Sequence, residues 1–385
     1  MAATAPAPSA AEHAAGLADY IKAGEKRAYA LGNRGPLEVD ADGNVASHIV
    51  AAYWKQGFYV FEGMVSEAEL AELRRDVDAM LAAAPPAPDS GREARGTPGT
   101  RYRFERTSYR YARPLGDPVG GTQYNKGRHP VRMVEPTPDG AVPAWTVERL
   151  MGNLQAMDSC LRLYGHPGLL TIAATLAGAD FVPYNEVTFV KEPGLGPSVS
   201  WHQDGTTHWD ADDWDAGAHG FNSMTQLFPS TAANGVWVVP GSHRQGKVDI
   251  RGMVAAHGSE RLPDAVPVLA GAGDICVVNR QCVHGSFPNS SAERRITLNA
   301  GFFPRDRVIG VSTERLDGTT DHYDLERVET RARLIPLAID ARAQRYPEEP
   351  RYEYAPEAAQ PGTVRWSEET RETVLRNYDL LDMYL

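Results

Sequence analysis

The sequence predicts a mainly β protein with flanking helices, in which the strands build a sandwich or a barrel. Between residues 181 and 303, short runs rich in Val, Ile and Phe are separated by Gly, Pro and Asn turns. Before and after this region, apolar residues recur at helical spacing. The chain has 385 residues, 42% of them hydrophobic, which predicts one large domain with extensions or with a small appendage.

Composition excludes several functional classes. The net charge of -11 argues against nucleic acid or an acidic membrane as a partner. Three cysteines without CxxC spacing indicate neither a disulfide framework nor a zinc site, and they fit a reducing compartment. No run of about 18 apolar residues is present, which argues against a membrane-spanning helix. Residues 1–10 are rich in Ala and Pro and lack signal-peptide features, so we expect a short disordered tail and a cytoplasmic protein.

The N-terminal part predicts helices around one strand. Apolar spacing predicts helices over 11–31 and 48–56, followed by a strand over 58–61. Ser66 and Glu69 then form the signature of a capping box and start a third helix, which Pro residues end near residue 85.

The segment 85–143 is dense in Pro, Gly and Arg, and it alternates in 101–106 and 108–111. A long segment of this kind inside a domain is usually functional or disordered. It is either a cover that offers cations and aromatic rings to a substrate, or a solvated surface whose arginines lie along it. The second interpretation is the commoner use of such a composition.

The middle of the chain predicts two helices and then the strands of the β region. Helices are expected over 147–164 and 167–176. Strands are expected over 181–190, 199–203, 221–228, 236–239, 266–269, 275–279 and 296–303.

Residues 206–220 interrupt the strand pattern and predict an insertion loop near the mouth of a site. Four aspartates in it could contact a cationic substrate, although such a run is more often simply solvated. His208 and His219 in the same loop are expected at the surface rather than at the substrate. His243 lies in a turn and is expected to be structural.

The tail from residue 305 onward is more helical and more charged. A helix is expected from Asp324 to Tyr346, interrupted by Pro336, and Ser367 can cap a last helix that runs through Leu380. The tail has no catalytic spacing, so we expect it to pack on the core or to form a contact between copies of the chain.

A candidate metal site lies in the β region. His202 and Asp204 sit at i and i+2, and alternate side chains of a strand point to the same face. One imidazole and one carboxylate make two thirds of the facial triad that holds non-haem Fe(II). His284 supplies a third ligand about eighty residues later, and it is followed by Arg294 and Arg295.

Several spaced motifs occur in order along this region. They are Trp201-His202-Gln203-Asp204, Asn234-Gly235, Pro240-Gly241-Ser242-His243-Arg244, Gly273-Asp274 and His284-Gly285-Ser286, followed by Asn289, Ser291 and Arg295. Together they resemble the phytanoyl-CoA dioxygenase (PhyH) family of Fe(II)/2-oxoglutarate-dependent oxygenases. The resemblance covers roughly residues 50–305 and implies a double-stranded β-helix, also called a jelly-roll or cupin-like core. We therefore expect a disordered tail over 1–10, an oxygenase domain over 11–305 and a helical extension over 306–385.

The resemblance also assigns roles. It implies that His202, Asp204 and His284 hold Fe(II), with open positions for 2-oxoglutarate and O2. Arg295 would bind the distal carboxylate of 2-oxoglutarate, because an arginine fork matches a carboxylate, and Arg294 is the fallback on the opposite face of the strand. The remaining residues that would line the cosubstrate pocket are Ser286, Gln203, Met224 and Gln226.

These roles predict a dioxygenase that hydroxylates a C–H bond of a small organic substrate and releases succinate and CO2. Related halogenases have a small residue at the position of Asp204, where chloride binds, so the aspartate predicts oxygenation instead. The alternative is a jelly-roll protein whose metal serves no redox purpose, such as an isomerase or a ligand-binding module. The sequence leaves open whether the substrate is a CoA thioester, a free acid or a natural product, and whether the outcome is hydroxylation or desaturation.

Overall fold

The strands of the computed structural model form two main sheets. The structure describes residues 6–88, 108–205, 208–214, 219–314, 319–358, 364–375 and 378. An eight-stranded sheet has the order β1 (Arg34–Gly35), β2 (Phe58–Phe61), β10 (Ile275–Asn279), β7 (Phe221–Gln226), β12 (Arg295–Phe303), β5 (Val182–Lys191), β4 (Thr146–Leu150) and β3 (Tyr109–Ala112). A four-stranded sheet has the order β6 (Val199–His202), β11 (His284–Ser286), β8 (Trp237–Val238) and β9 (Val266–Pro267). A small third sheet pairs β13 (Ser312–Glu314) with β14 (Thr320–His322).

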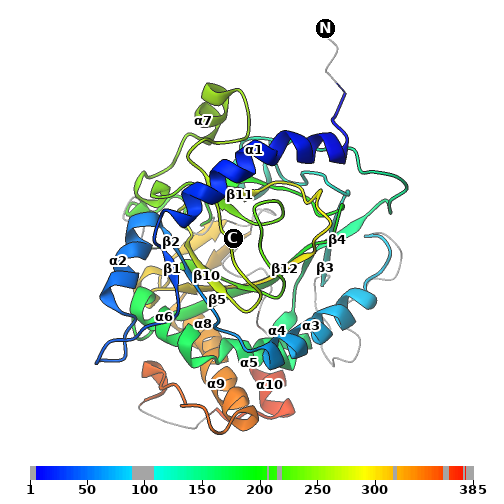
Figure 1. Cartoon of the computed structure of the whole chain (residues 1–385). Coiled ribbons are helices and arrows are strands. Elements are labelled where there is room, and N and C mark those ends of the chain that lie inside the picture. Colours follow the sequence, from blue (N-terminus) through cyan, green and yellow to red (C-terminus); the bar gives the residue numbers. More distant parts are fainter. Residues whose placement is uncertain are drawn as a thin grey trace.

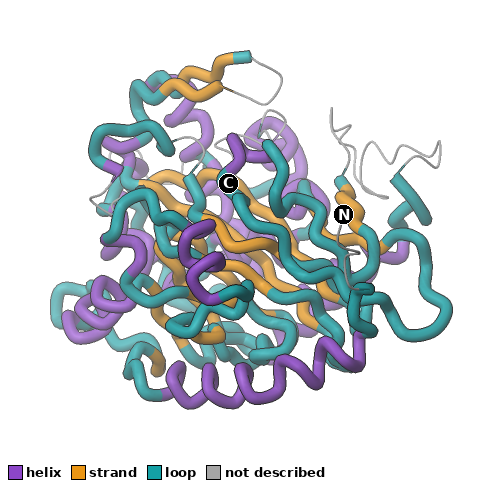
Figure 2. The backbone as a smooth tube through the Cα atoms, turned by 90° about the horizontal axis from the view of Figure 1, so that it is seen from above, coloured by secondary structure: helices purple, strands orange, loops and turns teal. Residues whose placement is uncertain are grey.

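The two main sheets face each other across an apolar layer. Val60 of β2 and Cys276 of β10 belong to one buried cluster with Val238 of β8 and Val266 of β9. Pairing is antiparallel within the sheets, except between β1 and β2. The strands of the two main sheets lie at the centre, and helices surround them (Figure 2). This arrangement is the predicted jelly-roll core with flanking helices, and the fold class is confirmed.

Helices cover the outer faces of both sheets (Figure 1). The large sheet packs on α3 (Glu67–Ala82), α5 (Asp158–Tyr164), α6 (Pro167–Ala177) and α9 (Leu334–Arg345). The small sheet packs on α1 (Ala10–Tyr29) and α7 (Ile250–His257) through Leu17, Trp201, Trp237 and Ile250. The helix α2 (Ser47–Gln56) lies where it was predicted and ends at Gly57, whose φ of 81° favours glycine. Among the described residues, no helix is both long and apolar enough to cross a membrane.

The N-terminal tail is shorter than the sequence predicts. Ser9 accepts a hydrogen bond from the Glu12 amide and completes a capping box for α1. Pro8 and Ala10 exchange backbone hydrogen bonds with Thr137, both of 2.8 Å. The prediction of disorder through residue 10 is therefore wrong for Pro8 to Ala10, while residues 1–5 lie outside the described part.

The helix predicted over 147–164 is also wrong. Its first four residues belong to the strand β4, which pairs with β3 and β5. Gly152 follows in a left-handed conformation, with φ of 76°, and breaks any continuous helix. Two short helices, α4 (Asn153–Ala156) and α5, then complete the segment. The buried positions of β4 alternate, and this period of two was overlooked beside the helical spacing of the later leucines.

The helical tail breaks one turn earlier than predicted. The helix α8 (Leu325–Ala332) ends at Arg333, and Pro336 lies in the first turn of α9. A proline is tolerated there because the first amides of a helix have no intrahelical partner. The last helix, α10, spans Glu368–Leu375, and most of the residues predicted beyond it lie outside the described part.

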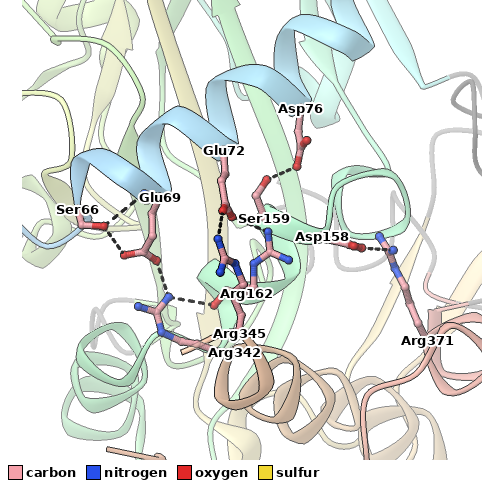
Figure 3. Close-up of polar contacts among 10 residues, drawn as sticks. All are labelled: Ser66, Glu69, Glu72, Asp76, Asp158, Ser159, Arg162, Arg342, Arg345 and Arg371. Carbon is pink, nitrogen blue, oxygen red and sulfur yellow. Dashed lines mark hydrogen bonds and ion pairs between the residues drawn. The ribbon is translucent and has the colours of Figure 1, made fainter. Parts of the chain in front are cut away.

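The tail is attached to the core by buried ion pairs (Figure 3). Arg342 of α9 contacts Glu69 of α3 at 2.6 Å and Glu349 at 2.6 Å. Arg371 of α10 donates hydrogen bonds to the carbonyls of Leu154 and Gln155. The extension therefore packs against α3, α4 and α5 rather than standing apart from them.

Arg342→Ala is expected to lower the free energy of unfolding by about 3–5 kcal/mol, because it leaves the buried Glu69 without its counter-charge. Side-chain exposures of 4% for Arg342 and 11% for Glu69 place this pair in the interior. Chemical denaturation measures the effect, with Arg345→Ala as the matched control. Arg345 pairs with Glu72 on the same two helices but is 54% exposed, so its loss should change little. Equal effects of the two variants would contradict a buried anchor.

Candidate metal centre

Three side chains from the two ends of the predicted motif meet between the sheets. His202 ends β6 and His284 begins β11, and the two residues are directly paired in the antiparallel register. Asp204 follows β6, with Oδ1 3.2 Å from His202 Nε2 and Oδ2 3.5 Å from His284 Nε2. One ligand atom from each of the three lies within 4.8 Å of the others, and all three residues are candidates for one metal ion.

Both imidazoles are oriented by backbone carbonyls. His202 Nδ1 lies 2.9 Å from the Ser200 carbonyl, and His284 Nδ1 lies 2.9 Å from the Cys282 carbonyl. A carbonyl can only accept, so each Nδ1 carries the proton and donates it. This leaves the lone pair of each Nε2 directed toward Asp204, as metal-binding histidines require.

Hydrogen bonds from neighbouring residues hold the carboxylate of Asp204 in one orientation. Asn222 Nδ2 donates to Asp204 Oδ2 at 2.5 Å, and the Tyr184 hydroxyl donates in turn to Asn222 Oδ1. The Asp204 amide donates to the Arg280 carbonyl at 2.8 Å. Outer partners of this kind hold a ligating carboxylate in one orientation.

The charge state of the three side chains suits a divalent metal. Burial lowers the pKa of His284 to about 4, with a further contribution from His202, so the ring is neutral at neutral pH. Burial alone would raise the pKa of Asp204, but His284 and His202 lower it well below its usual range. Two imidazoles and one carboxylate form the donor set that binds non-haem Fe(II) and leaves positions open. The residues present therefore fit such an ion.

The three candidate ligands line a cavity of about 660 Å³ of empty space, part of it open to solvent. Arg295 of β12 reaches the same cavity, where Nε donates to Thr297 Oγ1 and Nη1 donates to the Asn234 carbonyl, both at 2.9 Å. Among the described residues no carboxylate pairs with this buried guanidinium. Burial lowers the pKa of Arg295 to about 10, so it stays charged at neutral pH. A buried cation without a counter-ion indicates a site for an anionic group.

Arg294 faces the other way, as strand alternation predicts. It pairs with Asp78 at 2.9 Å and with Glu192 at 3.0 Å on the outer surface of the sheet. Of the two arginines, only Arg295 lines the cavity.

The other residues predicted around the cosubstrate divide into three cases. Met224 and Ser286 line the cavity, and Ser286 Oγ accepts a hydrogen bond of 2.8 Å from Lys191. Gln226 contacts the site indirectly. Its Oε1 accepts a hydrogen bond from the Thr297 hydroxyl, which itself accepts one from Arg295. The prediction that Gln203 lines the cosubstrate pocket is wrong. Its side-chain amide donates to the Gly246 and Gln281 carbonyls, away from the cavity. Gln203 follows directly after His202, the last residue of β6, and its side chain points away from the side shared by His202 and Asp204.

Sequence reasoning missed Tyr124, Asn125 and His129, which cover the cavity. The His129 ring stacks on His202 with ring centres 4.1 Å apart, and burial lowers the pKa of His129 well below its usual value. The described part of 85–143 therefore supports the interpretation as a cover rather than as a solvated surface. The alternation over 101–106 lies outside the described residues. No regular sequence spacing relates His129 to the metal-ligand motif. The composition of the segment was therefore the only signal that it lies at the site.

The insertion differs from its prediction at two histidines. His208 and His219 are buried rather than at the surface, with ring centres 4.7 Å apart. His208 Nε2 lies 2.7 Å from the Arg307 carbonyl, and His219 Nε2 lies 3.1 Å from a carboxylate oxygen of Asp213. His243 has the expected structural position, buried and in contact with the Trp54 carbonyl. Residues 206–207 and 215–218 of this loop lie outside the described part.

Comparison with known proteins agrees with the motifs. Residues 152–297 match the family model of phytanoyl-CoA dioxygenase (PhyH). The resemblance to the PhyH family is confirmed. The PhyH match includes all three candidate ligands and Arg295. A curated protein named phytanoyl-CoA dioxygenase 1, from Oryza sativa subsp. japonica, is 31% identical over 117 residues, which are 28% of this chain and only 40% of that protein.

Two solved structures are similar over most of the chain. One is EctD from S. alaskensis with 2-oxoglutarate and 5-hydroxyectoine, at 18% identity and a TM-score of 0.47, covering 74% of this chain and 83% of that one. The other is SnoN, a non-haem α-ketoglutarate-dependent epimerase from nogalamycin biosynthesis, at 18% identity and a TM-score of 0.46, covering 70% and 82%.

Proposed function

We propose that this protein is an Fe(II)/2-oxoglutarate-dependent dioxygenase that hydroxylates a C–H bond of a small organic substrate. The observation that carries the proposal is the pairing of two features in one cavity. These are the open set of His202, Asp204 and His284, and the buried guanidinium of Arg295, which pairs with no carboxylate of the described residues. A metal-binding module without redox activity has no need of such a cation, so Arg295 favours the oxygenase over that alternative.

In this proposal His202, Asp204 and His284 hold the iron, whose open positions take 2-oxoglutarate and O2. When bound, the iron supplies the oxidative chemistry, in which O2 and 2-oxoglutarate yield succinate, CO2 and one oxygen atom for the substrate. The sum is substrate C–H plus 2-oxoglutarate plus O2 giving substrate C–OH plus succinate plus CO2. The chain supplies position and exclusion of water.

Each protein group has a defined task in this scheme. Arg295 holds the distal carboxylate, and Thr297, with Gln226 behind it, keeps the guanidinium in place. The Tyr184–Asn222 pair keeps Asp204 turned toward the metal. Tyr124, Asn125 and His129 form one wall of the cavity and limit the access of water from that side.

The test is oxygen-dependent release of succinate from 2-oxoglutarate by the Fe(II)-loaded protein, across a panel of small organic compounds. We expect stimulation by a compound that becomes hydroxylated, identified by a mass increase of one oxygen atom. His202→Ala should abolish turnover, because it removes one of the three protein ligands. Equal turnover by wild type and His202→Ala would refute the assignment.

A further inference from the structure

The cavity has a second polar wall that the PhyH match does not include. It comes from residues 124–129, whereas the match begins at residue 152. Two side chains of this wall, Asn125 and His129, are 5% and 3% exposed, and both line the cavity beside the candidate metal ligands.

Asn125 carries a buried oxygen that has no partner among the described residues. Its Oδ1 accepts no hydrogen bond from them, although the side chain is almost completely buried. The backbone of Asn125 is in the left-handed region, with φ of 50°, which asparagine tolerates better than most residues. A buried amide without a partner is unfavourable unless a ligand or water satisfies it. This side chain is therefore held ready for a hydrogen-bonding group in the cavity.

The ring of His129 lines the same cavity. Its Nδ1 lies 3.2 Å from Ser200 Oγ and 3.4 Å from the Ser200 carbonyl, the carbonyl that also anchors His202. The two rings are stacked, with an angle of 26° between their planes. The Nδ1 atoms of both rings therefore face Ser200, and His129 lines the cavity together with His202, Asp204 and His284.

Most of the remaining wall of this chamber is apolar or uncharged. Phe189, Val199 and Val236 line it, and the Asn299 amide enters it from β12, on the same face of that strand as Arg295. Arg149 also reaches the cavity but is paired with Glu148 at 3.2 Å. Beyond the metal ligands and Arg295, the described wall offers neither an unpaired carboxylate nor an unpaired cation.

We propose that Asn125 and His129 bind an uncharged oxygen- or nitrogen-bearing group of the substrate, a hydroxyl or an amide, carried on an apolar skeleton. Such a group both donates and accepts, which matches an amide side chain and a ring nitrogen. With Arg295 occupied by 2-oxoglutarate and Arg149 paired with Glu148, a substrate carboxylate would find no unpaired cation among the described side chains of the wall. An ammonium group would find no carboxylate there outside the metal site. The proposal rests on the proposed function, because it assigns the remaining cavity to the substrate.

The test uses three probes with one skeleton: hexanamide, hexanoate and hexylammonium. The full-length protein is loaded with Zn(II), a diamagnetic substitute for iron, and saturated with 2-oxoglutarate so that Arg295 is occupied. Saturation-transfer NMR and its titration give the affinity of each probe. We expect hexanamide to bind at least ten-fold more tightly than either charged probe. The amide can form hydrogen bonds in the cavity without burying an unpaired charge, and each lost hydrogen bond weakens binding by roughly a factor of ten.

Asn125→Gly and His129→Phe should each weaken hexanamide binding roughly ten-fold. Glycine accepts the left-handed backbone, and phenylalanine keeps the stacking on His202. Gln123→Ala, at an exposed position of the same segment, is the matched control and should bind as wild type. The proposal is overturned if a charged probe binds as tightly as hexanamide, if hexanamide does not bind at millimolar concentration, or if both variants bind it normally.

Affinity for 2-oxoglutarate should be the same in all four proteins, which shows that the variants are folded. If one variant fails this check, the proposal is still tested by the other variant and by the comparison of the three probes on the wild-type protein. Loss of succinate release with hexanamide binding intact would instead contradict the proposed function alone, because probe binding to the Zn(II) protein requires no redox chemistry.

Discussion

Asp204→Ala should abolish succinate formation and weaken Fe(II) binding by more than about 100-fold, the upper end of the cost of losing an outer partner of a metal ligand. Asp204 is the single anion of the candidate donor set and lies within hydrogen-bonding distance of one histidine and 3.5 Å from the other. Alanine leaves two neutral imidazoles, which bind a divalent cation much more weakly than a set with a carboxylate. Anaerobic Fe(II) titration and the succinate assay measure the two effects.

Two further variants should show a smaller loss of iron affinity and no loss, respectively. Asn222→Ala removes only the hydrogen bond behind Asp204 and should cost about 10–100-fold in iron affinity. Asp210→Ala removes an aspartate of the insertion that is 73% exposed and pairs with Lys126 and Lys247, and this variant should bind iron as wild type. Iron binding by Asp204→Ala equal to that of Asp210→Ala would mean that the carboxylate is not a ligand.

Arg295→Ala should raise the dissociation constant for 2-oxoglutarate by about 10²–10³-fold, because a buried, charge-assisted pair is worth roughly 3–4 kcal/mol when one partner is truncated. The guanidinium is fixed by Thr297 and Asn234, so a bound carboxylate meets a group already in position. Arg295→Lys should recover only part of the affinity, since an ammonium cannot form the two parallel bonds. Iron binding without 2-oxoglutarate should change little, which separates this effect from loss of the metal.

The adjacent arginine provides the matched control. Arg294→Ala removes the same charge one residue away, but its side chain lies on the outer face with Asp78 and Glu192. It should leave the affinity for 2-oxoglutarate unchanged. If Arg294→Ala lost affinity while Arg295→Ala kept it, the assignment of the cosubstrate anchor would be reversed.

The sequence predicted the centre of the site because strand geometry is local. A period of two places His202 and Asp204 on one face and Gln203 on the other, and it separates Arg295 from Arg294. The same rule could have corrected the assignment of Gln203 before the structure was known. The meeting of His284 with His202 depends on register between distant strands, and only the resemblance to the PhyH family indicated it.

Other features depend on tertiary contacts that no local pattern contains. The strand β4 was predicted as helix because its alternation is only five residues long and leads directly into helical spacing. His129 belongs to a segment without regular period and reaches the site through Ser200 and His202. His208 and His219 were expected at the surface because they lie in the insertion, yet both are buried and the His208 ring lies 5.0 Å from that of Phe303. The division at residue 305 and an oligomeric contact through the tail remain predictions.

The central claim, that His202, Asp204 and His284 hold one iron ion beside a bound 2-oxoglutarate, is tested most directly by anaerobic titration of the protein with Fe(II) in the presence of 2-oxoglutarate. We predict that one Fe(II) binds per chain and that a weak visible charge-transfer band grows to saturation at that ratio. Oxygen should then discharge the band as succinate forms. Absence of the band in wild type at saturating Fe(II), or the same band in Asp204→Ala, would contradict the account.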